Sequence, residues 1–164
     1  MKSDRGTWRP LRRDELRDEL VHDSYKSRRK LPEPTKCPDC GVVYANGRWQ
    51  WGVAPEQAHE ELCPACHRIR DRFPAGYVVL SGEFFAGHRE ELLHLARNRE
   101  EKEKAEHPLE RIMAIEDVER GVQITTTDTH LARDIGEAMH AAYKGELQYH
   151  YNKEENLLRV HWAR

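Results

Sequence analysis

Four cysteines carry the most recognisable chemistry in this sequence. They form two C-x-x-C pairs, Cys37 with Cys40 and Cys63 with Cys66, with 22 residues between the pairs. Each pair brackets two residues, so a single turn can present both sulfurs to one ion at the ~2.3 Å typical of zinc–sulfur bonds. The spacing therefore predicts one Zn²⁺ site. Four cysteine ligands make a closed site, which is structural rather than catalytic.

Other uses of these cysteines remain open. Disulfides would form in an oxidising compartment, and paired cysteines can also hold an iron–sulfur cluster or take part in redox chemistry. His67 directly follows Cys66 and offers a replacement ligand. Adjacency makes that geometry awkward, and a surface histidine is the simpler interpretation.

Basic and aromatic side chains are interleaved around the cysteines. Three arginines alternate directly after Cys66, an Arg-Trp step lies between the two pairs, and a run of cations precedes them. This pattern is typical of phosphate pairing and base stacking on irregular RNA. Alternatively, the tryptophans form the core of the zinc module and the arginines are solvated. The candidate RNA contacts are Lys26, Arg28, Arg29, Lys30, Arg48, Trp49, Arg68, Arg70 and Arg72.

A threonine-rich segment, Thr125–His130, places hydroxyls, a carboxylate and an imidazole at a predicted strand-to-helix junction. The N–H groups of a helix start can receive an anion, so Thr127, Asp128, His130 and Arg133 are candidate contacts for an anion or a partner. Helix capping and strand propensity explain most of the run, and spacing assigns no nucleophile with an adjacent base. The sequence contains neither a G-x-x-x-x-G-K nor a G-x-G-x-x-G motif, so a nucleotide-dependent enzyme finds no support.

Three segments must position these residues. Residues 1–36 read as a basic, partly disordered arm, and residues 37–74 as a zinc module with too few aliphatic side chains to fold without a metal. Residues 75–164 alternate strand and helix patterns. Residues 1–74 contain 15 Lys and Arg and 12 Asp and Glu, whereas residues 75–164 contain 12 and 17. This uneven charge favours a basic contact face at one end only.

The alternating part predicts an α+β fold. The expected strands are 77–84, 111–116, 122–126, 147–151 and 157–162, and the expected helices are 88–106 and one capped by Thr127 and Asp128. This order is β-α-β-β-α-β with the last strand doubled, as in a ferredoxin-like domain. Both helices would cover one face of an antiparallel sheet, leaving the other face available for a partner.

No apolar stretch approaches the ~20 residues that cross a bilayer, and the N-terminus leads into no apolar signal region. We therefore expect a cytoplasmic protein without membrane contact.

Four segments resemble a group of small bacterial zinc-binding proteins: Lys30–Gly52, Leu62–Gly76, Ala105–Asp117 and Thr125–Ala138. These in turn look like shortened relatives of the archaeal and eukaryotic large-subunit export adaptor family, known as nonsense-mediated mRNA decay protein three. That family binds the large ribosomal subunit through cysteine-rich zinc modules. The resemblance implies that the four cysteines ligate zinc and that ribosomal RNA or the large subunit is a partner. This chain has fewer cysteines and lacks the adaptor's later domains and export signals.

Three functions follow as hypotheses. The first is a non-catalytic, ribosome- or RNA-associated factor acting in large-subunit maturation, hibernation or rescue. The second is a protein–protein adaptor with a structural zinc head. The third is a hydrolase that uses Asp128 and His130 at the threonine-rich junction.

Overall fold

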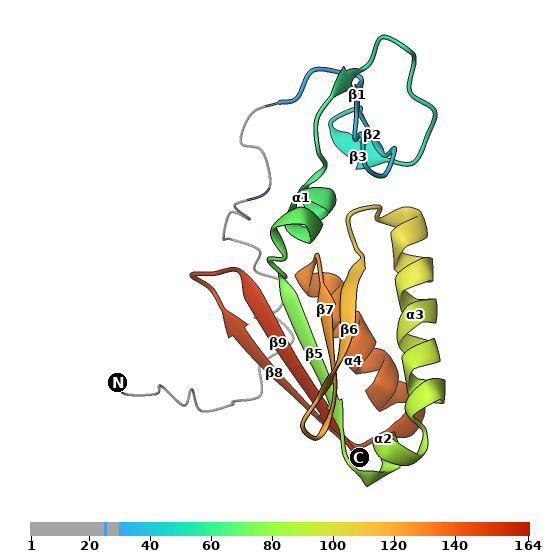
Figure 1. The fold of residues 1–164 in the computed structure, drawn as a ribbon, viewed down its shortest axis with the longest axis vertical. Helices are drawn as coiled ribbons and strands as arrows, with labels where there is room; N and C mark the ends of the chain where they lie inside the picture. The colour runs from blue at the N-terminus through green and yellow to red at the C-terminus, as the bar shows by residue number, and fades with distance from the viewer. Residues whose placement is uncertain (1–24, 26–29) are drawn as a thin grey trace.

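The computed structural model describes Tyr25 and residues 30–164. These residues form a mixed α/β arrangement of two mixed sheets and four helices. Figure 1 shows the small sheet at one end of the molecule and the large sheet, with its helices, filling the other. Most of the predicted arm, including Lys26, Arg28 and Arg29, lies outside the described residues.

The small sheet surrounds the first cysteine pair. It has the order β3-β2-β1-β4 and is followed by the helix α1. Its strands are β1 (Thr35–Lys36), β2 (Val43–Ala45), β3 (Arg48–Gln50) and β4 (His59–Glu60), and α1 is Pro64–Asp71. Because β1 pairs with both β2 and β4, this unit begins two residues before the predicted boundary at Cys37.

The large sheet has the order β6-β7-β5-β9-β8. Its elements follow the predicted order along the chain, with one short added helix. They are β5 (Gly76–Ser81), α2 (Glu83–Gly87), α3 (Arg89–Glu106), β6 (Ile112–Val118), β7 (Gly121–Thr126), α4 (Thr129–Tyr143), β8 (Glu146–Asn152) and β9 (Leu157–Ala163).

The terminal hairpin corrects the prediction of an antiparallel sheet. Its second strand, β9, inserts between β5 and β8 and runs parallel to β5. Leu158, Val160 and Trp162 of β9 are buried, whereas Leu147 and Tyr149 of β8 are only partly buried. The more apolar strand therefore takes the inner position, where it is covered on both sides by neighbouring strands.

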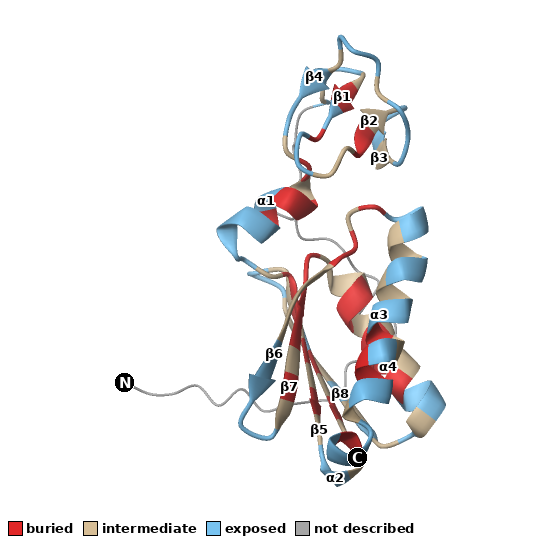
Figure 2. Cartoon of the chain, turned by 45° about the vertical axis from the view of Figure 1, so that its right-hand side comes forward, coloured by how far each residue is buried: buried red, intermediate tan, exposed pale blue. Residues whose placement is uncertain are grey.

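The main core lies between the sheet and the helices α3 and α4, which cover one face (Figures 1 and 2). Leu131, Ile135 and Met139 form the predicted apolar stripe of α4 and are fully buried. No helix among the described residues is both long and apolar enough to cross a membrane.

The predicted strand 77–84 ends early, at Ser81, and the chain turns into α2. Gly82 makes this turn with φ of 106°, and a Cβ there would lie 2.2 Å from the carbonyl oxygen of Arg164. Only glycine fits this position. The side chain of Phe85, on α2, is buried in the main core.

Candidate metal centre

Four cysteine side chains converge where the small sheet meets α1. Cys37 follows β1, and the tight turn after it is closed by a hydrogen bond from the Gly41 N–H to the Cys37 carbonyl. Cys63 is the N-cap of α1, and its sulfur accepts the N–H of Cys66 at 3.3 Å. Local turn and cap geometry thus point both pairs inward, and all four sulfurs lie within 4.8 Å of one another.

The sulfur positions fit a tetrahedral metal. The Cys40 and Cys63 sulfurs are 3.8 Å apart. A tetrahedron with metal–sulfur bonds of ~2.3 Å has edges of ~3.8 Å, so a tightly bound ion of this size can contact all four sulfurs. The cysteines also pack with Val42 and Ala65 into one small buried cluster, which contains few other apolar side chains. The four cysteines therefore lie at metal-binding distance from one another within the core of the small unit.

A residue from outside the small unit completes the site. It belongs to the part of the chain that forms the large sheet and its helices, which we call the large domain. Arg111, just before β6, is only 6% exposed, and its two terminal nitrogens donate to the sulfurs of Cys66 and Cys40, each at 3.1 Å. Its Nε donates to the carbonyl of Pro108 at 2.8 Å, which fixes the guanidinium plane. Four thiolates around a divalent ion carry a net charge of −2, and Arg111 offsets part of it where water cannot.

Sequence reasoning missed Arg111. It lies 45 residues after Cys66, and an arginine at the predicted start of a strand has no distinguishing pattern. Only the fold brings it to the cysteines.

Burial and neighbouring groups shift the pKa values of the cysteines and of Arg111. Burial raises the pKa of the Cys63 thiol, and it raises that of Cys66 to about 11 despite the hydrogen bond from Arg111. Burial also opposes ionisation of Cys37, but the backbone N–H groups of Cys63, Cys40 and Asp39 outweigh it and lower this pKa to about 7. The pKa of Arg111 is raised: burial acts against its charge, and the sulfurs of Cys40 and Cys66 outweigh burial. Arg111 therefore stays charged.

A groove of about 730 Å³ separates the small unit from the large domain. One wall comes from β2, β3 and the residue after β3, and the other from the end of α3 and the segment that precedes β6. The first wall is formed by Tyr44, Gly47, Arg48, Trp49, Gln50 and Trp51. Trp51 connects the two walls of the groove, because its indole nitrogen donates to the carbonyl of Lys104 at 2.8 Å.

The candidate RNA contacts separate into three kinds. Lys30, Arg48 and Arg72 are exposed, and Trp49 is half-buried with its ring against Tyr44, 5.4 Å between centroids. Arg70 is exposed but forms a two-pronged ion pair with Asp39, at 2.8 and 2.6 Å.

Arg68 is the one buried residue among the predicted RNA contacts that the structure describes. It is 2% exposed, donates to the carbonyl of Phe73 and lies 4.3 Å from the ring centroid of Tyr25. The alternating arginines suggested a shared surface, but residues two apart on a helix do not face the same way. Since they belong to α1 and its C-cap, Arg68 points inward and Arg70 points outward.

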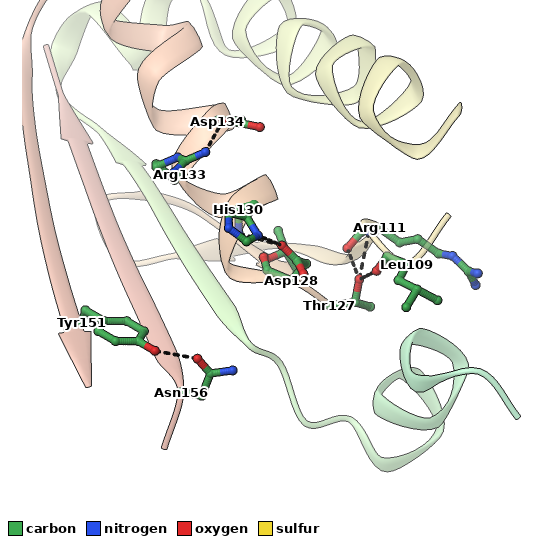
Figure 3. A network of polar contacts seen from close by, with 10 residues as sticks. Leu109, Arg111, Thr127, Asp128, His130, Arg133, Asp134, Tyr151 and Asn156 are labelled. Carbon is green, nitrogen blue, oxygen red and sulfur yellow. Dashed lines mark hydrogen bonds and ion pairs between the residues drawn. The ribbon is translucent and has the colours of Figure 1, made fainter. Parts of the chain in front are cut away.

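One residue of the threonine-rich junction, Thr127, has a structural role. The Thr127 hydroxyl donates to the carbonyl of Leu109 at 2.6 Å and accepts the N–H of Arg111 at 2.9 Å, and the residue is buried (Figure 3). An anion contact is therefore not available to it. Asp128 is the N-cap of α4: its Oδ1 accepts the N–H of His130 at 2.7 Å and lies 3.1 Å from the His130 Nδ1. Arg133 pairs with its neighbour Asp134.

The fold adds Glu110 to this junction. Its side chain is within metal-ligand reach of both Asp128 and His130, and one carboxylate oxygen, Oε2, is buried without a hydrogen-bond partner. Burial raises the pKa of Glu110 to about 8, and the nearby carboxylate of Asp128 adds to the rise. Figure 3 shows Arg111 pointing away from Asp128 and His130, so this cluster and the cysteine site lie on opposite sides of one short segment.

Comparisons with protein-family models, curated proteins and solved structures find no match to this chain. The resemblance to the export adaptor family stays a prediction from the sequence.

Proposed function

We propose that this protein is a non-catalytic, zinc-binding factor that associates with RNA. Zinc is the ion best suited to four thiolates at tetrahedral separation, because it accepts sulfur ligands readily and undergoes no redox change. With all four positions filled by cysteine, the ion has no open site for substrate. Its role is to hold the small unit together.

The groove wall is the observation that supports RNA association. Tyr44, Arg48, Trp49, Gln50 and Trp51 all line one groove, and they belong to the small unit that the zinc ion would hold together. Aromatic faces stack on unpaired bases, worth ~1–3 kcal/mol per base, and this stacking does not depend on sequence. Arg48 is exposed at the rim, where it can pair with a phosphate.

The opposite wall is acidic and fits this use. Glu106, an exposed glutamate, lines it. Carboxylates repel phosphates but accept hydrogen bonds from exocyclic amino groups of bases. We therefore expect unpaired bases to enter the groove while the phosphate backbone stays at its rim. Single-stranded loops of ribosomal RNA, as the family resemblance implies, present bases in this way.

Charge reversal at Arg48 tests the proposal. Fluorescence anisotropy would follow the zinc-loaded, full-length protein binding to a labelled single-stranded RNA at low salt. Arg48→Glu should weaken binding about tenfold and reduce the slope of log affinity against log salt by ~0.7, the value of one phosphate contact with a single strand. Arg97→Glu is the matched control: Arg97 is an exposed arginine on α3 outside the groove lining, and its reversal should have little effect.

Absence of RNA binding at low salt, or equal losses from both reversals, would reject the groove as the RNA site. Co-sedimentation with ribosomal subunits, with and without nuclease, then tests the partner. Capture of a protein that survives nuclease treatment would instead support the adaptor function.

A further inference from the structure

A second group of potential metal ligands lies outside the cysteine site. Donor atoms of Glu110, Asp128 and His130 are all within 4.8 Å of one another. Glu110 comes from the segment before β6, and the other two from the start of α4, so residues far apart in the sequence meet at one point. Glu103 and Asp134 form an overlapping set with Glu110.

Glu110 is the residue that this arrangement leaves unsatisfied. It is 9% exposed, and its Oε2 has no hydrogen-bond partner among the described residues. A buried polar atom without a partner destabilises the folded state, and more so when it is charged. A cation bound by this carboxylate and the two neighbouring ligand side chains would give the buried Glu110 a partner.

Three arginines among the described residues are directed to groups other than Glu110. Arg99 pairs with Glu103 and Arg133 pairs with Asp134, each at 3.4 Å, and the guanidinium of Arg111 is directed to the cysteine sulfurs. Each of these arginines is thus matched to another anionic group.

The cluster is open to an ion from the groove. Glu110 and Asp128 both line the groove, and the side chain of His130 is 33% exposed. The positive end of α4 opposes a cation only weakly. Asp128 already accepts an N–H group at that end. Two carboxylates outweigh a penalty of this size, because buried charges of opposite sign attract more strongly than that.

We propose that Glu110, Asp128 and His130 bind a divalent transition-metal cation of the Mn²⁺ class, separate from the zinc held by the cysteines. Two carboxylates and one imidazole are ligands that Mn²⁺ accepts, whereas four thiolates select softer ions. The contact between Asp128 and the His130 ring also resembles the way in which a carboxylate orients a metal-binding histidine. The groove leaves remaining coordination positions to water. This site does not depend on the RNA-binding proposal.

A Mn²⁺ titration of the full-length, zinc-loaded protein tests the site. Electron paramagnetic resonance measures free Mn²⁺ directly, and zinc content is measured in the same samples. One Mn²⁺ should bind per chain with zinc retained. Glu110→Gln and His130→Gln should each weaken binding at least about tenfold, because each removes one of three protein ligands. Glu106→Gln, which changes an exposed glutamate on the same groove wall, should change affinity less than about twofold.

Glu110→Gln keeps the shape of the side chain and removes only the metal-binding carboxylate, so loss of folding is not expected to obscure the result. Thermal unfolding of each variant provides that check. The proposal is overturned if no saturable Mn²⁺ binding occurs, or if Glu106→Gln weakens it as much as Glu110→Gln. Mn²⁺ that binds only as zinc is released would also overturn it, since the ion would then occupy the cysteines.

Discussion

At the scale of single residues, Arg111 decides how the cysteine site is coupled to the rest of the molecule. It is the only described residue of the large domain for which hydrogen bonds to the cysteine sulfurs are observed. Two N–H groups meet two different sulfurs, one from each C-x-x-C pair. The guanidinium therefore compensates charge and fixes the relative position of the pairs at once.

Replacing Arg111 by methionine should weaken zinc binding by about 10- to 100-fold, the range seen when groups that support metal ligands are removed. The physical reason is that the thiolate charge loses its buried counter-charge. Competition with a chromophoric chelator measures the affinity. Arg111→Lys should give a smaller loss, because it keeps the charge but not the two-pronged geometry. Arg97→Met serves as the exposed control, and an Arg111→Met affinity within about twofold of the unmodified protein would refute this role.

The four cysteines could be identified from the sequence because their spacing alone encodes the turn geometry. Arg111 and Glu110 could not, since they reach their partners only after α3 and β6 have packed. The burial of Arg68 was not foreseen for a different reason. Its alternation with Arg70 is also compatible with a strand, and the helix that starts at Pro64 was not recognised.

At the scale of elements, the segment before β6 is held by the start of α4. Thr127 forms the link: its hydroxyl contacts the Leu109 carbonyl and the Arg111 N–H, and its own N–H donates to the Arg111 carbonyl at 2.9 Å. Arg111 and Glu110 both lie in the clamped segment. The clamp thus positions residues of the cysteine site and of the second ligand cluster.

Substituting Thr127→Val should lower the free energy of unfolding by ~1–3 kcal/mol. Valine keeps the shape but leaves a buried carbonyl and a buried N–H without their partner. Urea unfolding followed by circular dichroism measures the change. Thr129→Val, in the first turn of α4 and only partly buried, is the control. Equal effects of the two substitutions would mean that loss of a hydroxyl at this junction, rather than the clamp, causes the destabilisation.

Element positions were largely predictable, whereas their pairing was not. The stripe Leu131, Ile135 and Met139 repeats at helical spacing, and Pro108 lies just beyond α3, so both helices follow from local pattern. Both strands of the terminal hairpin alternate in the same way, and local pattern does not say which one pairs with β5. A signal was present in composition, because β9 carries Leu158, Val160 and Trp162 where β8 carries tyrosines.

At the scale of the whole molecule, the two units differ in what stabilises them. The large domain has a continuous apolar core between its sheet and the helices α3 and α4. Among the described residues, the small unit buries three small apolar side chains besides its cysteines: Val42, Val43 and Ala65. Units with so little apolar burial generally need a metal to fold, and the binding free energy of the metal is then their folding free energy.

Removing the metal should therefore unfold one unit and spare the other. Hydrogen exchange measured by mass spectrometry on the full-length protein, with and without a strong zinc chelator, should show loss of protection across residues 35–71. Strands β5, β7 and β9 should keep most of theirs, because their core contains no metal ligand. The segment 109–111 should lose protection only in part: Arg111 loses its sulfur partners while the Thr127 clamp persists. Equal loss across both units would mean that they fold as one cooperative body, and that the bridge formed by Arg111 and Trp51 outweighs the separation of their cores.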